Sequence, residues 1–319
     1  MKIYLKINGG KILKKIRAKL GRLGLSHSAR ESKPLIRKLI RKVKRHINFF
    51  ALYFLLIFLA SAQLVQAFPF LPKKGPGSVE VPIIMYHLIT KNSKYQGKYG
   101  ISIAEMENDL AYLRENGYET VIMSDLIEFV YSGRALPEKP VMLTFDDGYS
   151  SDLRYLLPLL AKYKMKAVTS IVGKYVEESV SDSNGTINPY LTWAQIKELH
   201  DSGLVEIQNH SFDLHGRHGS GKRGGELAEA YQARLSADLA KCQESVKKNI
   251  GVTPTAYTYP LGIISKGSKA VLVSLGFKAS LSCSEGMNII EENNPDCLFS
   301  LRRNIRKSGS PLSRVLGSI

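Results

Sequence analysis

Two adjacent carboxylates, Asp146 and Asp147, follow an apolar run in the stretch LTFDDGYSSD (residues 143–152). Neighbouring anions repel each other, and burying either one is costly unless a cation lies beside it. One interpretation is a turn, because Asp-Gly is a common turn pair. The other is a metal site, in which one carboxylate binds the ion and its neighbour acts as a base.

Two histidines, His210 and His215, lie close together in EIQNHSFDLH (206–215). On a helix this spacing would turn them about 140° apart, so they converge only where a strand runs into a loop. Two imidazoles and one carboxylate are the donor set of a catalytic zinc site. We therefore predict that Asp147, His210 and His215 bind a divalent metal ion, most simply Zn2+, with Asp146 as the base that takes a proton from the attacking water.

The segments that must position these residues alternate between two patterns. Strands are predicted at 81–87, 119–123, 139–145, 166–173, 204–210, 254–260 and 277–283. Helices are predicted at 104–116, 124–133 (beginning at Ser124), 151–163 (interrupted at Pro158), 192–203, 225–251 and 268–276. This alternation is typical of an α/β fold with a parallel sheet, and one body of about 240 residues suits a barrel. The two acids, the histidines and YTYPLG (257–262) all follow predicted strands, where such barrels carry their sites.

The charge of the chain is concentrated at its beginning. The net charge is +17, but residues 1–46 hold 16 Lys/Arg against one acid, Glu31, so the rest of the chain is nearly neutral. We interpret 1–46 as a basic cytoplasmic tail, on the inner leaflet or in solvent. A nucleic-acid partner is not expected, because the body lacks the charge and an apolar run follows the tail.

Residues 47–71 are uncharged and long enough to cross a bilayer as one helix. The preceding Lys/Arg residues predict that the C-terminal body lies outside the cytoplasmic membrane. The run is either an uncleaved anchor or a late signal peptide, since ASA (60–62) and VQA (65–67) resemble cleavage sites. We expect a linker at 72–80 and one domain at 81–319. The three cysteines form no metal-binding spacing and receive no functional role.

The motifs TFDDGYSSD, NHSFDLH and AYTYPLG, with VPIIMYHLI near the start of the domain, resemble those of the polysaccharide deacetylase family (the NodB-homology domain, carbohydrate esterase family 4). The resemblance covers roughly 81–305, with its motif core at 139–305. It implies a distorted (β/α)7 barrel, a divalent metal, and removal of N-acetyl groups from N-acetylglucosamine (GlcNAc) units with release of acetate. The gap between the two histidines is similar to that of the branch acting on poly-β-1,6-GlcNAc, with peptidoglycan as the other expected substrate.

The resemblance also implies roles for individual residues. Asp146 would be the base, and Asp147, His210 and His215 the metal ligands. The backbone N–H of Tyr149 would hold the oxyanion. Tyr259 and Pro260, within YTYPLG, would line the sugar groove, where the rings of Tyr257, Tyr259 and Trp193 either stack on sugars or pack the barrel.

Two positions depart from the family pattern. Thr258 stands where the family often has an arginine that orients the base, and Cys283 stands where many members have a general-acid histidine. The proton donor to the leaving amine is therefore open, with His87 of MYHLI as one candidate. Arg302 or Arg303 is the other basic residue expected to reach the site.

Competing functions are separated by the same residues. A non-catalytic glycan-binding protein on this fold would not need the base Asp146. A haloacid-type phosphatase would need two aspartates separated by one residue, whereas Asp146 and Asp147 are adjacent. The sequence therefore favours the deacetylase, with the glycan-binding protein as the alternative.

Overall fold

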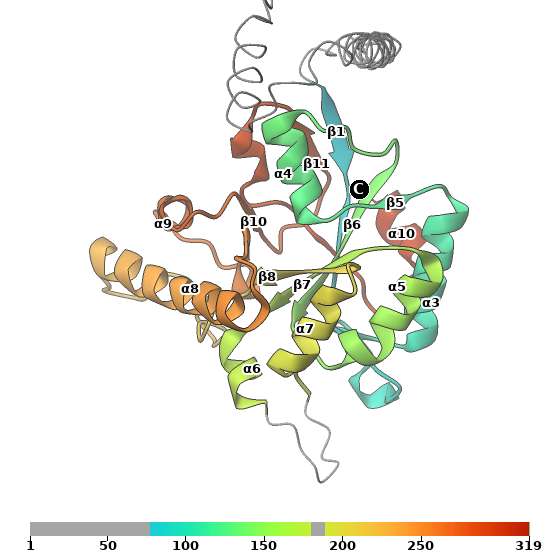
Figure 1. Cartoon of the computed structure of the whole chain (residues 1–319), viewed down its shortest axis with the longest axis horizontal. Helices are drawn as coiled ribbons and strands as arrows, with labels where there is room; N and C mark the ends of the chain where they lie inside the picture. The colour runs from blue at the N-terminus through green and yellow to red at the C-terminus, as the bar shows by residue number, and fades with distance from the viewer. Residues whose placement is uncertain (1–76, 180–188, 319) are drawn as a thin grey trace, which may run out of the picture. The chain divides into compact units, whose positions relative to one another are not determined.

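The computed structural model describes residues 77–179 and 189–318. Its central feature is a parallel sheet in which seven strands follow one another in the order β10-β9-β8-β7-β6-β2-β12, and β5 pairs with the start of β6 (Figure 1). These strands are β2 (Ile83–Tyr86), β5 (Glu119–Thr120), β6 (Pro140–Asp147), β7 (Ala167–Ile171), β8 (Val205–Asn209), β9 (Ala256–Thr258), β10 (Ala279–Leu281) and β12 (Asn304–Ile305).

The two ends of this sheet meet through one short segment. Leu301 bridges Leu281 of β10 in parallel, and its N–H donates to the Ser280 carbonyl. A few residues later, β12 pairs with β2. The sheet therefore curls into an incomplete barrel, and the predicted α/β fold with a parallel sheet is confirmed.

Helices surround the sheet, and most of them pack on its outer face (Figure 1). They are α3 (Ile103–Glu115), α4 (Met123–Ser132), α5 (Leu157–Tyr163), α6 (Gly173–Glu178), α7 (Trp193–Asp201), α8 (Ala228–Ile250), α9 (Ser268–Ser274) and α10 (Leu312–Gly317). The ends of α7 match the sequence pattern, because Thr192 and Gln195 form a reciprocal capping box. The prediction that Pro158 interrupts its helix is also met: a π-helical turn (Asp152–Leu156) comes first, and α5 then begins beside the proline.

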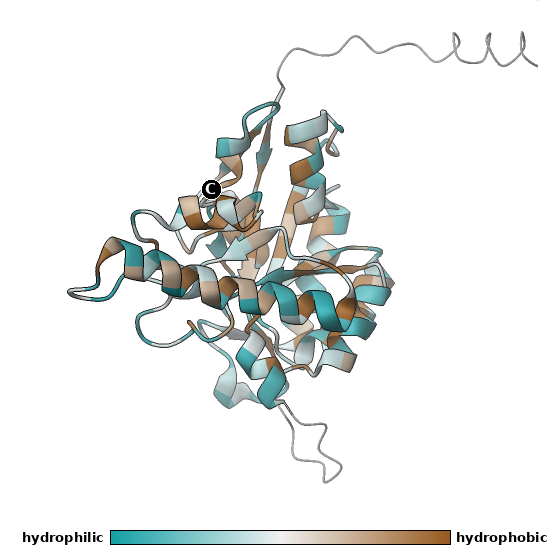
Figure 2. Ribbon diagram, turned by 60° about the vertical axis from the view of Figure 1, so that its left-hand side comes forward, coloured by the Kyte–Doolittle hydropathy of each residue, from teal (hydrophilic) through white to brown (hydrophobic). Residues whose placement is uncertain are grey.

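The longest helix, α8, has one apolar face. Its buried side chains recur every three or four residues, at Tyr231, Leu235, Leu239, Cys242, Gln243, Val246 and Ile250. Figure 2 shows the corresponding alternation of hydrophilic and hydrophobic residues along the helix. Each fully buried Leu or Val contributes roughly 1.5–3 kcal/mol, so this stripe fixes α8 against the sheet.

The inner face of the sheet changes character along the strands. Near the strand starts, inward side chains such as Ile83, Met142 and Val168 pack against Leu126 and Phe129 of α4 in one apolar cluster. Two and four residues further along β6, the inward positions are Thr144 and Asp146, both buried. The barrel is thus closed at one end by α4 and carries polar groups at the other.

The start of α4 differs from the prediction. The helix begins at Met123, so Ser124 lies inside it and is not the N-cap. The Asp125 carboxylate accepts from the Ile122 N–H instead, and Glu206 of β8 accepts from the Ser124 N–H at 3.2 Å. The cap was missed because one acceptor comes from a strand 82 residues away.

Four further strands and the chain before them complete the description. The first strand, β1 (Ser78–Val81), pairs antiparallel with β11 (Asn288–Glu291), so the folded domain begins inside the predicted linker. The short strands β3 (Leu88–Ile89) and β4 (Gly100–Ile101) pair with each other. Within the described ranges no helix is long and apolar enough to span a bilayer. The predicted span at 47–71 and the basic tail lie outside those ranges.

Glu206 predicts a pH dependence of stability. Burial raises its pKa from 4.5 to about 7, against the hydrogen bonds that it accepts at the start of α4. The folded protein then binds a proton that the unfolded chain has released, so this residue lowers stability as pH rises from about 4.5 to about 7. As pH rises from about 5 to about 8, the unfolding free energy of the wild type should fall because of this residue. In Glu206→Gln we expect that fall to be smaller by about 1–3 kcal/mol. Denaturant unfolding at several pH values measures this, and parallel pH curves for the two proteins would contradict it.

Candidate active site

Asp146 and Asp147 form the last two residues of β6, and both carboxylates line the same cavity. Successive side chains of a regular strand point to opposite faces. Asp147 has a positive φ of 76°, as does Gly148 with 74°, and this left-handed turn brings the second carboxylate to the side of the first. Aspartate tolerates this backbone region better than most residues. The turn interpretation of the Asp-Asp-Gly stretch is therefore confirmed, and the turn places both carboxylates at one cavity, as the metal-site interpretation requires.

A fully buried arginine binds the first carboxylate. Arg303 Nη1 and Nη2 donate to the two Asp146 oxygens at 2.7 and 2.8 Å, and its Nε donates to the Ser282 carbonyl. Such a fork is the strongest geometry for an arginine–carboxylate pair. Burial favours the neutral carboxyl, but the Arg303 guanidinium outweighs it and holds the pKa of Asp146 below its usual value. Asp146 is consequently an anion inside the protein.

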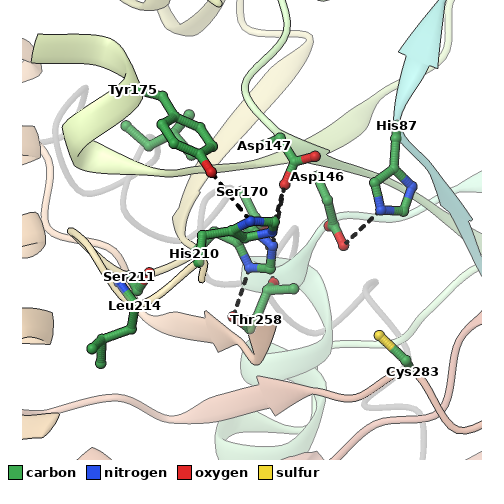
Figure 3. Close-up of polar contacts among 12 residues, drawn as sticks. His87, Asp146, Asp147, Ser170, Tyr175, His210, Ser211, Leu214, Thr258 and Cys283 are labelled. Carbon is green, nitrogen blue, oxygen red and sulfur yellow. Dashed lines mark hydrogen bonds and ion pairs between the residues drawn. The ribbon is translucent and has the colours of Figure 1, made fainter. Parts of the chain in front are cut away.

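The second carboxylate faces two imidazoles. Asp147 Oδ1 lies 3.0 Å from His215 Nε2 and 3.5 Å from His210 Nε2 (Figure 3). One ligand atom from each of the three residues lies within 4.8 Å of the other two. His210 comes directly after β8, and His215 follows in the loop, as expected for a strand that runs into a loop.

The donor atoms of this cluster fit a divalent metal ion. Asp147 Oδ1 is buried and has no partner with hydrogen-bond geometry among the described residues, which is costly unless a cation binds there. His210 Nδ1 bonds to the Thr258 carbonyl at 2.8 Å, so its Nε2 is the lone-pair nitrogen that faces Asp147. Two histidines and one carboxylate form a three-residue ligand set that leaves positions for water and substrate.

The two histidines are supported differently. His210 is almost fully buried, and its hydrogen bond to the backbone fixes its ring. His215 is 19% exposed at its side chain, and its Nδ1 lies 3.4 Å from the Tyr175 hydroxyl. The Tyr175 ring also packs edge-on against the His215 ring. His215 is thus the ligand on the solvent side of the cluster.

The cavity above these residues has a volume of about 470 Å³, a size typical of small-molecule sites. Its lining comprises Met85, His87, Lys98, Tyr99, Asp146, Asp147, Tyr149, His210, His215, Leu261, Cys283, Glu285, Ile305 and Lys307. All three members of the metal cluster and the neighbouring Asp146 belong to it. One cavity is therefore bordered by Asp146 and by the cluster of Asp147, His210 and His215 together.

His87 lies on the side of Asp146 that is away from the cluster of Asp147, His210 and His215 (Figure 3). Its Nε2 lies 3.9 Å from Asp146 Oδ2. Burial lowers the pKa of His87, although the Asp146 carboxylate opposes this. Cys283 lies on the same wall, with its sulfur 3.8 Å from Arg303 Nη2. His87 is thus an imidazole beside the base that contributes no atom to the metal cluster.

The backbone hydrogen bonds around Tyr149 involve its neighbours in the chain. On either side of it, the Ser150 N–H donates to the Pro189 carbonyl and the Leu191 N–H donates to the Gly148 carbonyl. No backbone acceptor among the described residues takes the Tyr149 N–H itself. Tyr149 also lines the cavity, and its role as oxyanion donor stays a prediction.

Three predicted substrate contacts are placed elsewhere. Tyr259 is 1% exposed and its hydroxyl bonds to Ser268, and Pro260 is also buried, so neither lines the cavity. The next residue, Leu261, lines it instead. Arg303 contacts the base and not the cavity, and it fills the role expected of the arginine that Thr258 replaces. Its partner could not be predicted, because nothing in the sequence links residues 157 positions apart.

The comparisons with known proteins agree with this arrangement. Residues 133–280 match the family model described as polysaccharide deacetylase. Just under half of the chain is thus similar to a polysaccharide deacetylase domain. The matched segment contains the two aspartates and two histidines of the site, whereas His87 and Arg303 lie outside it.

Two curated relatives are poly-β-1,6-N-acetyl-D-glucosamine N-deacetylases. The one from Escherichia coli K12 is 26% identical over 227 residues, covering 64% of this chain and 34% of the relative. The one from Staphylococcus aureus MSSA476 is 25% identical over 194 residues, covering 61% of this chain and 64% of the relative. The chain thus spans about a third of the length of the first relative and less than two thirds of the second.

Solved structures share the fold of the deacetylase domain. A de-N-acetylase from Aggregatibacter actinomycetemcomitans superposes with a TM-score of 0.64 at 22% identity, covering 76% of this chain and all of that one. IcaB from Ammonifex degensii superposes with a TM-score of 0.60 at 23% identity, covering 74% of this chain and 95% of that one. At this identity the likeness concerns the fold alone.

The metal cluster predicts unequal roles for two histidines of one loop. His215→Ala removes a ligand, whereas His218→Ala changes an exposed histidine outside the cluster. We expect the first change to weaken Zn2+ binding at least 100-fold (roughly, because changes outside the ligand set already cost 10–100-fold) and the second to leave it unchanged. Competition with a chromophoric chelator measures both affinities. Equal affinities in the two variants would exclude His215 as a ligand.

The buried ion pair predicts a non-additive effect on stability. Arg303→Met leaves Asp146 as an uncompensated buried charge, which is expected to cost about 3–5 kcal/mol of unfolding free energy. Adding Asp146→Asn removes that charge, so the double variant should recover a large part of the loss. Denaturant unfolding of the wild type, both single variants and the double variant completes the cycle. Additive effects would show that the pair is not coupled.

Proposed function

We propose that this protein is a metal-dependent N-deacetylase that hydrolyses the acetamide groups of a GlcNAc polysaccharide and releases acetate. The observation that carries the proposal is the position of Asp146, an anion fixed by Arg303 beside the Asp147, His210 and His215 cluster in one cavity. A protein that only binds glycans has no need of such a carboxylate. This favours the enzyme over the glycan-binding alternative.

Asp146 is the general base in this proposal. Its charge is maintained by the Arg303 fork, and its carboxylate lines the cavity where water and substrate meet. It takes a proton from the attacking water. The ion held by Asp147, His210 and His215, for which we propose Zn2+, supplies Lewis-acid polarisation of the acetamide carbonyl when bound.

The remaining steps use groups on the cavity wall. The Tyr149 N–H donates to the oxygen that becomes negatively charged in the tetrahedral intermediate. The departing amine needs a proton, and His87 is the candidate donor because its Nε2 lies beside Asp146. Asp146 passes the proton from water to His87 or directly to the amine, so the protein finishes each cycle in its starting state. Cys283 does not replace His87, because burial raises the pKa of its thiol and its sulfur contacts Arg303.

We propose a β-1,6-linked GlcNAc polymer as the substrate and the outside of the cytoplasmic membrane as its location. The substrate is supported by the names of the two relatives and by the spacing of the two histidines. The location is supported by the basic residues 1–46 and the apolar residues 47–71. An anchored protein and a form released by cleavage are both compatible with this location.

Acetate release by the purified full chain tests the proposal. We expect release from β-1,6-GlcNAc oligomers that is lost on adding a chelator and restored by Zn2+. Asp146→Asn should lower kcat at least 100-fold (roughly, the lower limit for losing a general base). Parallel assays on β-1,4-GlcNAc oligomers and on peptidoglycan test the choice of polymer. Unchanged Zn2+ binding in Asp146→Asn is the control for folding, and no release from any glycan by the metal-loaded wild type would overturn the proposal.

A further inference from the structure

An exposed tyrosine stands at the mouth of the cavity. Tyr99 is 51% exposed although it lines the same cavity as the base and the metal cluster. Large aromatic side chains are normally buried, and one left open beside a site is available to a ligand. No step of the proposed reaction uses Tyr99, and no sequence motif singled it out.

Tyr99 is fixed in position despite its exposure. Its ring meets the His87 ring edge-on at a centroid distance of 4.9 Å, and Lys98 Nζ lies 4.9 Å from its centroid. Its carbonyl accepts from the Leu88 N–H at 3.0 Å, within the pairing of β3 and β4. The ring is thus ordered before any ligand binds, which lowers the entropic cost of binding.

The loop that carries Tyr99 is also held closed. The Gly97 N–H donates to the Gly100 carbonyl, and the Ser308 N–H donates to the Gly97 carbonyl. Gly100 passes so close to the Tyr95 carbonyl that a Cβ atom at this position would overlap it. Only glycine permits this close approach, so the tight loop specifies where Tyr99 stands.

We propose that Tyr99 is a stacking platform for a pyranose ring of the substrate, next to the unit that is deacetylated or under that unit itself. This inference rests on the proposed function for the class of substrate. In a β-linked GlcNAc unit the ring substituents are equatorial, so both faces of the ring present axial C–H groups. Such a face packs against the apolar face of an aromatic ring.

The position of the platform relates binding to chemistry. His87 contacts Tyr99 on one side, and its Nε2 lies 3.9 Å from Asp146 on the other. A sugar on Tyr99 is therefore separated from the base by a single imidazole. Tyr99 is expected to act on substrate affinity and not on proton transfer, because its hydroxyl is not needed for stacking.

The same loop offers a matched control. Tyr95 is 60% exposed, belongs to the single-turn 3-10 helix Ser93–Tyr95, and does not line the cavity. Tyr95→Ala therefore removes an equally exposed aromatic ring from the same loop without touching the site. Tyr99→Phe keeps the ring and removes only the hydroxyl.

Calorimetric binding of β-1,6-GlcNAc oligomers tests the inference without turnover, in full-length protein carrying Asp146→Asn. Tyr99→Ala should weaken binding about tenfold, corresponding to about 1.4 kcal/mol for a lost ring contact. Tyr99→Phe should keep most of the affinity, and Tyr95→Ala should match its parent. Unchanged affinity in Tyr99→Ala, an equal loss in Tyr95→Ala, or no binding of the oligomers to the parent would overturn the inference.

Kinetics in the background with Asp146 intact separate stacking from a structural effect on His87. For stacking, Tyr99→Ala raises KM for the oligomers by a larger factor than it changes hydrolysis of the small ester p-nitrophenyl acetate, because that ester carries no sugar. A fall in kcat on both substrates would overturn the inference and assign Tyr99 to the support of His87. Tyr99-dependent glycan binding without any acetate release would sustain the platform and refute the deacetylase. If Tyr99→Ala releases acetate with a normal KM for the oligomers, the deacetylase would be supported and the platform refuted.

Discussion

The buried pair between Asp146 and Arg303 is the interaction on which the rest of the site depends. Two neighbouring carboxylates at the end of a buried strand repel each other, and here each one faces different partners. Arg303 donates two hydrogen bonds to Asp146. Asp147 faces the imidazoles of His210 and His215, and together these three residues fit a divalent ion. Because Arg303 belongs to the segment that joins β10 to β12 and β2, the contact that keeps the base ionised also joins the ends of the sheet.

Strained backbone marks the turns that bring these groups together. Besides Asp147, the non-glycine residues Ser211 and Leu261 have positive φ values of 77° and 59°. Ser211 follows the metal-cluster residue His210, and Leu261 lines the cavity after β9. Each such residue costs of order 1–3 kcal/mol and persists only when its surroundings fix it. Ser211 is fixed by local bonds, since its N–H donates to the Asn209 side chain and its hydroxyl accepts from the Leu214 N–H. Among the described residues, three of the six non-glycine residues with positive φ thus lie where strands deliver side chains to the cavity, and the other three, Lys164, Asn293 and Ser300, lie elsewhere.

Local sequence signals predicted the parallel α/β fold, most element positions, and the residues that meet at the cavity floor. These signals work because apolar periodicity, caps and strand-end motifs act over a few residues. Arg302 or Arg303 was expected at the site, but the pairing of Arg303 with Asp146 was not predicted, and neither was the Glu206 cap of α4, because both depend on distant partners. The two-residue strand β12 was missed because it is too short to show a period. Tyr259 was assigned to the groove because an aromatic residue at a strand end gives no sign of which face it takes. Its neighbours in the fold decide this, and they bury it against Ser268.

Exposure of the functional groups rises in order from the back of the site to its mouth. Arg303 is fully buried and Asp146 and His210 are 2% exposed, whereas the side chains of His87 and His215 reach 14% and 19% and Tyr99 reaches 51%. Groups that must keep a charge or a geometry are shielded from water. In the protein interior electrostatic interactions are stronger, and packing locks the rotamers. Groups that would meet a polymer under the proposed function lie outward, since a chain of linked sugars would enter from the open side. The inner contacts can therefore hold Asp146 and the proposed metal ligands in position while residues of the outer cavity wall change. We expect differences in substrate among such domains to arise from outer residues such as Tyr99 and Leu261.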